Sequence, residues 1–125
     1  MKLEFLPSGS PECPLLRLYG FDRDEAVRLR DICLELANGN RKAFSLPGDF
    51  HVEPLGGCRL ALKRSQVRRG IRQTEASVFE CELESGDWDN IAGLIEPFCQ
   101  SDVAGYQWLV EKGEVSLLFS RDGKW

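Results

Sequence analysis

Histidine, paired cysteines and long apolar runs are scarce or absent in this chain of 125 residues. It has 1 histidine, His51, which excludes any metal site or catalytic constellation that needs two. No stretch reaches the roughly 18 consecutive apolar residues of a membrane-spanning helix. The N-terminus carries Glu4 and Pro7 where a secretory signal would be apolar. We therefore expect a cytoplasmic protein that is not associated with a membrane.

The sequence also lacks the common signatures of catalysis. It contains no Gly-x-Ser-x-Gly, no phosphate-binding loop and no dinucleotide fingerprint. There is no Cys-x-x-Cys pair and the cysteine count is odd, which argues against a zinc ribbon or a disulfide framework. We expect most cysteines to be small buried residues. No catalytic residue and no cofactor is assigned, and an enzyme is disfavoured.

Composition describes a folded domain with an acidic balance. Hydrophobic residues make up 42% and charged residues 29%, which is ordinary for a globular protein and too apolar for a disordered one. The net charge of -4 argues against nucleic acid or anionic lipid as the main partner.

Two helices are expected in a single α+β domain over 15–125, after an irregular leader over 1–14 that leaves room for a short strand at Lys2–Leu6. The apolar spacing predicts a helix over 22–38, with Asp22 as its cap and Gly39 as its stop. A second helix is expected to open at Asp87 and to end or kink at Pro97.

Strand patterns surround both helices. Short strands are expected at 15–19, 42–46, 58–63 and 79–84, and a hairpin over 106–111 and 114–119 turns at Lys112-Gly113. Asp22 aligns with Asp87 at an offset of 65, which suggests half-repeats at about 15–72 and 75–125. An ordinary α+β order explains the same pattern, so the repeat stays open.

The expected fold is α+β, with duplicated β-α-β-β units forming one mainly antiparallel sheet of six to seven strands and two helices on one face. In the last hairpin, Leu109 and Leu118 are expected on the face opposite Trp108 and Leu117, leaving a partly apolar face for a groove or for self-association.

Charge is divided into two blocks. Residues 59–72 carry six basic side chains and no acid, whereas 75–102 carry eight acids and no Lys or Arg. One interpretation pairs these blocks across facing strands of a long hairpin. The alternative is an anion site for a phosphate, a nucleic-acid backbone or an acidic partner, formed by Arg64, Arg68, Arg69 and Arg72. Nucleic acid is the weaker version because no aromatic residue is interleaved for base stacking.

A second candidate site lies in the loop Asp49-Phe50-His51-Val52-Glu53. In an extended chain, Asp49, His51 and Glu53 point one way, as a general base oriented by an acid or as ligands of a divalent metal would. The alternative is a solvated polar loop.

The third candidate is aromatic. Tyr19, Trp88, Trp108 and Trp125 are predicted to line a small-ligand pocket or a partner surface. Tyr106 shares a strand face with Trp108, and the competing interpretation places that face in the core. The sequence therefore favours a non-catalytic module that binds a small ligand or a protein partner, a homodimer included. The alternatives are an enzyme or metal protein using Asp49, His51 and Glu53, and an anion or nucleic-acid binder using 64–72.

Overall fold

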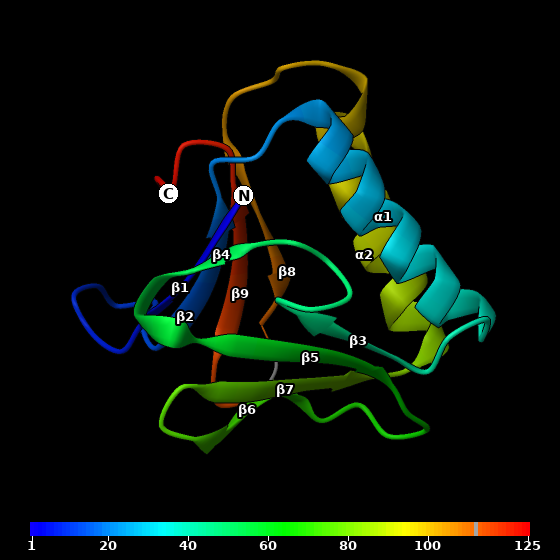
Figure 1. The fold of residues 1–125 in the computed structure, drawn as a ribbon, viewed down its shortest axis with the longest axis horizontal. Coiled ribbons are helices and arrows are strands. Elements are labelled where there is room, and N and C mark those ends of the chain that lie inside the picture. The colour runs from blue at the N-terminus through cyan, green and yellow to red at the C-terminus, as the bar shows by residue number, and fades with distance from the viewer. Residues whose placement is uncertain (112) are drawn as a thin grey trace.

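The computed structural model describes residues 1–111 and 113–125 and contains two mixed sheets and two helices (Figure 1). Sheet A consists, in spatial order, of β4 (Glu53–Pro54), β1 (Lys2–Leu6), β2 (Leu15–Tyr19), β9 (Ser116–Ser120) and β8 (Tyr106–Val110). Sheet B consists of β3 (Ala43–Leu46), β5 (Arg59–Arg64), β7 (Val78–Leu83) and β6 (Gly70–Glu75). The helices are α1 (Arg23–Asn38) and α2 (Ser85–Gln100), and a short 3-10 turn, η1, covers Leu55–Gly57.

The α+β class is confirmed, but the predicted single antiparallel sheet is wrong. Each half of the chain runs through a strand pair, a helix and a second strand pair, and each helix links a pair in one sheet to a pair in the other. The pairs β1–β2 and β8–β9 then join through the parallel neighbours β2 and β9, and the pairs β6–β7 and β3–β5 join through β7 and β5. Because the helices carry the chain from sheet to sheet, no single sheet runs through both strand pairs of one half.

The first helix has the predicted limits. Asp22 is its N-cap and accepts from the backbone N–H of Glu25, while the Glu25 carboxylate accepts from the N–H of Asp22 at 3.1 Å. Gly39 ends the helix in the left-handed conformation. The expected strand at Lys2–Leu6 is β1, so within the leader only 7–14 is irregular.

The second helix begins two residues earlier than expected and is not ended by Pro97. Glu84 is its N-cap, and Asp87 lies at the third helical position, where its carboxylate accepts from the Glu84 N–H at 3.1 Å. Pro97 lies in the last turn of α2. Its missing N–H leaves one carbonyl without a helical donor, close to the helix end where the last carbonyls lack such donors in any case. Among the described residues, no helix is long and apolar enough to cross a bilayer.

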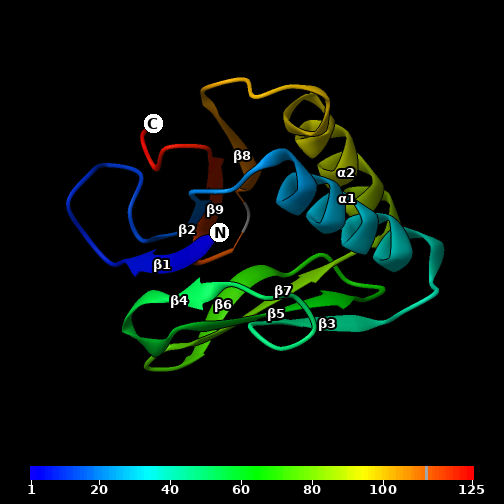
Figure 2. The ribbon, with the colours of Figure 1, turned by 45° about the horizontal axis from the view of Figure 1, so that its top comes forward.

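The helices pack side by side and cover the inner faces of both sheets (Figure 2). Both sheets and both helices contribute to one continuous core, in which Phe21 and Phe119 stack with ring centroids 3.9 Å apart. Cys33, Cys58 and Cys81 belong to this core, and Cys13 and Cys99 are half-buried. The helices leave the outer face of each sheet uncovered.

Candidate binding site

Three aromatic side chains line an open groove on the outer face of sheet A. Tyr106 and Trp108 come from β8, and Trp125 comes from the C-terminal tail. The groove has a volume of about 620 Å³. Tyr106 is 49% exposed and Trp125 37% exposed, so both rings are open to a partner. The polar and backbone part of the lining comes from Ser10, Glu12, Gly123 and Lys124.

A β-bulge in β8 decides which side chains face this groove. Trp108 lies opposite Leu118 on β9, but Val110 lies opposite Leu117, so Leu109 is the extra residue. Leu109 and Val110 are consecutive, yet both join the core together with Leu117. The prediction that Leu118 lies on the face opposite Trp108 is therefore wrong, because the two share the outer face.

The C-terminal tail is held in place by hydrogen bonds to the sheet. Arg17 donates from Nη1 to the carbonyl of Gly123 at 2.7 Å, and from Nε and Nη2 to Oε1 of Glu4 at 2.9 and 2.6 Å. Ser120 donates from Oγ to the carbonyl of Lys124 at 2.7 Å. These bonds fix the two residues before Trp125, and so they place its ring beside the groove.

One carboxylate and one ammonium group flank the rings. Hydrogen bonds from Ser10, from its own backbone and from Trp125 lower the pKa of Glu12 below its ordinary value, so this carboxylate is ionised at neutral pH. Lys124 supplies the opposite charge from the tail. The groove therefore offers ring faces, an acceptor and a donor within one open surface.

Two of the predicted aromatic residues lie elsewhere. Trp88 is 1% exposed and donates from Nε1 to the carbonyl of Lys63 at 3.1 Å, which makes it a satisfied core residue. Tyr19 lies on the outer face of sheet A, but the guanidinium of Arg17 covers its ring at 4.2 Å from the centroid. Tyr106, which the sequence also allowed as a core residue, belongs to the groove instead; no signal short of the strand register distinguishes the two faces.

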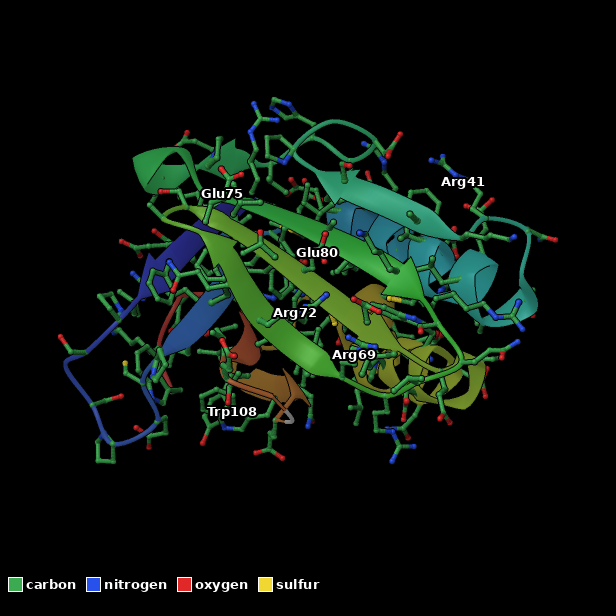
Figure 3. The ribbon with its side chains drawn as sticks, turned by 90° about the horizontal axis from the view of Figure 1, so that it is seen from below. Arg41, Arg69, Arg72, Glu75, Glu80 and Trp108 are labelled. Carbon is green, nitrogen blue, oxygen red and sulfur yellow. The ribbon has the colours of Figure 1, made fainter. Side chains whose placement is uncertain are left out.

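The two charge blocks meet on the outer face of sheet B. Acidic β7 lies between the basic strand β5 and β6, which supplies Arg72, so the expected single hairpin is replaced by three neighbouring strands. Lys63 Nζ lies 2.7 Å from Glu80 Oε1, and Arg72 Nη2 lies 3.1 Å from Glu82 Oε1 and 3.6 Å from Glu80 Oε2. Figure 3 looks onto this face and shows Arg72 and Glu80 close together. The predicted pairing of opposite charges across strands is confirmed.

Three of the four predicted anion-binding arginines form ion pairs with acidic side chains. Arg68 pairs with Asp87 at 2.7 Å, and Arg69 reaches Glu82 at 4.0 Å. Arg72 belongs to the ion pairs just described. Within the described residues, only Arg64 of the four predicted anion-binding arginines has no ion pair or side-chain hydrogen bond, and it borders a separate hollow near α1.

The loop at Asp49 has the expected alternation but does not gather into a site. Phe50 and Val52 are buried, while Asp49, His51 and Glu53 point to solvent. The Asp49 carboxylate accepts from the Ser45 N–H at 2.9 Å, and this bond, together with Arg41, lowers its pKa. Among the residues that the structure describes, no three His, Cys, Asp or Glu side chains lie close enough to hold a metal ion.

The buried thiols are unsuited to nucleophilic chemistry. Burial raises the pKa of Cys33 to about 12 and also raises the pKa of Cys81 and Cys58. Cys58 donates from Sγ to the carbonyl of Leu3 at 3.3 Å. Because the thiolate is the nucleophile, these protonated groups act as core residues.

Comparisons with known protein families, with curated proteins and with solved structures found no match to this chain.

Proposed function

We propose that this protein is a non-catalytic protein-binding module whose binding surface is the aromatic groove on the outer face of sheet A. One observation carries the proposal: Tyr106, Trp108 and Trp125, from two separate segments, converge on one open groove, and two of these rings are among the most exposed large hydrophobic side chains. Tryptophan and tyrosine are the residue types that anchor protein interfaces.

The shape of the groove favours a protein segment over a small molecule. Sites for small ligands enclose most of the ligand surface, whereas this groove is open along the sheet, between the tail and β8. An apolar side chain that projects from a partner would pack on the rings of Tyr106 and Trp108, with the polar rim satisfied around it.

The charges at the rim select the neighbours of that apolar side chain. Glu12 is ionised and would pair with a Lys or Arg of the partner, and Lys124 would pair with an Asp or Glu. The proposed occupant is therefore a segment of another protein that carries an apolar side chain flanked by one basic and one acidic residue.

The other sheet supports this choice by contrast. We infer that the two halves of the chain derive from one repeated strand pair–helix–strand pair unit, with Glu84 rather than Asp87 as the counterpart of Asp22, since these two are the N-caps. The outer face of sheet B is closed by ion pairs such as Lys63–Glu80, whereas the equivalent face of sheet A carries exposed rings. This contrast supports a binding surface on the outer face of sheet A rather than on that of sheet B.

A library of random linear peptides displayed on phage tests the proposal. Peptides selected on the wild-type protein should share an apolar residue between opposite charges. Their affinity, measured by fluorescence anisotropy, should fall about tenfold or more for Tyr106→Ala and Trp125→Ala, because each removes an interface ring. Both side chains are exposed, so the variants keep the core intact.

The matched control is Val67→Ala, which changes an apolar residue of 50% exposure outside the groove. This variant should bind the selected peptides as the wild type does. Selected peptides that bind Tyr106→Ala and Trp125→Ala at full strength would contradict the proposal, as would a library from which nothing is enriched.

A further inference from the structure

A second hollow, of about 610 Å³, lies where the end of α1 meets the start of α2. It is distant in sequence from the aromatic groove and shares no lining residue with it. Its size falls within the range of small-molecule sites, roughly 300–1,000 Å³. The side chains around it are polar or charged: Lys42, Arg64, Ser65, Gln66, Glu84 and Ser85, with Gly39 at the end of α1.

The opposite junction, between the end of α2 and the start of α1, is filled by Arg121. Its guanidinium donates to the carbonyl of Val103 at 2.7 Å, and to those of Phe21 at 3.2 Å, Phe98 at 3.3 Å and Ser101 at 3.3 Å. The bonds to Phe98 and Ser101 satisfy carbonyls left free at the end of α2, whereas Val103 and Phe21 belong to the segments that flank the helices. The side chain is 17% exposed, and its hydrogen bonds give Arg121 a structural role at this junction.

Arg64 occupies the corresponding place at its own junction but is not used in this way. Each arginine lies two residues after the last core residue of its strand, Leu62 in β5 and Phe119 in β9. Nη1 of Arg64 lies beside Gly39, the C-cap of α1, just as Arg121 lies at the end of α2. Within the described residues, however, the Arg64 side chain makes no ion pair or hydrogen bond.

Lys42 adds a second uncommitted cation at the same hollow. Its backbone is held to β5, because its carbonyl accepts from the Arg64 N–H at 2.8 Å, and its side chain has no ion pair within residues 1–111 and 113–125. Glu84 is the one acid among the lining residues. Two cations therefore face one carboxylate, which leaves a positive excess in the hollow.

The geometry points to a binding site for a phosphate monoester, with the phosphate held by Arg64 and Lys42. A guanidinium binds two phosphate oxygens with its planar fork, and an ammonium adds a point charge to the dianion. The Ser85 hydroxyl is already committed, since it donates to the carbonyl of Ala37 at 2.6 Å. The remaining volume accommodates the organic group, next to the polar side chains of Ser65 and Gln66.

Titration of the full chain with inorganic phosphate, followed by amide NMR at constant ionic strength, tests the phosphate subsite. The shifts should saturate and should be confined to residues 39–42, 64–66 and 84–86. Arg64→Gln should weaken binding about tenfold or more, because the fork is lost. Glu84→Gln should strengthen binding several-fold, because the opposing charge is removed.

Arg59→Gln is the matched control, since Arg59 is an exposed arginine of the same strand that does not line the hollow. It should leave the titration unchanged. Shifts that do not saturate, or that persist in Arg64→Gln, would overturn the site. Acetate binding at the same amides with equal affinity would overturn the assignment to a dianion.

A second titration, with glycerol 3-phosphate, tests the ester. Glycerol 3-phosphate should bind more tightly than inorganic phosphate and should cause additional shifts at residues 65 and 66. Equal affinity for the two compounds would show that the hollow does not hold the organic group, and would contradict that part of the proposal.

Discussion

Arg17 donates a hydrogen bond of 2.7 Å from Nη1 to the carbonyl of Gly123, which joins strand β2 to the last residues of the chain. The same guanidinium pairs with Glu4 and lies over the ring of Tyr19. A single side chain thus connects β1, β2 and the C-terminal tail. Together with the bond from Ser120 to the Lys124 carbonyl, this contact fixes the position of the Trp125 ring and with it one side of the groove.

Arg17→Met should release the tail. The variant loses the bonds to Gly123 and Glu4, and we expect a loss of about 1–2 kcal/mol in the free energy of unfolding. The indole N–H signal of Trp125 should sharpen and move toward its free-peptide position in NMR spectra. Arg59→Met serves as the control. An unchanged Trp125 signal in Arg17→Met would show that the tail is held by other contacts.

Arg121 and Arg64 should differ sharply in their effect on stability. Arg121→Ala leaves carbonyls of Val103, Phe21 and Phe98 without their donor, and we expect a loss of about 2–3 kcal/mol. Arg64→Ala removes an exposed side chain without partners among the described residues, and should change stability by less than about 0.5 kcal/mol. Urea unfolding of the two variants measures the difference. Equal losses would refute the distinction between a structural Arg121 and an Arg64 side chain that has no partner among the described residues.

Gly113 should tolerate no side chain. It has φ +93°, and a Cβ there would lie 2.7 Å from the Ile71 carbonyl oxygen and 2.8 Å from the Ile71 nitrogen. This close approach belongs to the contact between the sheets, where the Glu114 N–H donates to the Ile71 carbonyl at 3.0 Å. We expect Gly113→Ala to lower the free energy of unfolding, measured by thermal denaturation, by about 2 kcal/mol or more.

Gly93→Ala is the matched control for that substitution. Gly93 lies within α2, and a Cβ there would meet nothing within 4 Å. Because alanine favours the helix, this variant should be about 0.5–1 kcal/mol more stable than the wild type. A destabilised Gly93→Ala, or a neutral Gly113→Ala, would contradict the described packing.

Acid should weaken the ion pairs of sheet B. The hydrogen bond from Lys63 lowers the pKa of Glu80 below its ordinary value of 4.5, with smaller contributions from the charges of Lys63 and Arg72. A carboxylate whose pKa is lower in the folded state adds stability that is complete above the unfolded pKa and is lost as the pH falls through the folded pKa.

The wild type should therefore exceed Glu80→Gln in stability at neutral pH, and this advantage should shrink below about pH 4.5. Urea unfolding at several pH values between about 7 and 3 measures it. An advantage that is independent of pH would assign the effect of the substitution to packing rather than to charge.

Local patterns predicted much of the secondary structure but less of its assembly. Asp22, Glu25 and Gly39 define α1 because caps are read from neighbouring residues. The division into two sheets depends on contacts between segments far apart in sequence, such as β2 with β9, which no local pattern contains.

The candidate site shows the same limit. The sequence marked Trp108 and Trp125 as surface candidates, but Tyr106 could be placed only with the strand register and Trp88 only with the packing of α2. The bulge at Leu109 reverses the side-chain alternation that the prediction assumed. Arg64 was one of four predicted anion-binding arginines in the basic block, and only the positions of Asp87 and Glu82 separate it from the other three.

The indole N–H signals of the three tryptophans give the most direct test of the aromatic groove. A selected peptide, added to the labelled full chain, should shift the signals of Trp108 and Trp125 in a saturable manner. The signal of Trp88, buried and bonded to Lys63, should stay in place. Saturable binding that leaves Trp108 and Trp125 unmoved would contradict the account, because the partner would then bind another surface.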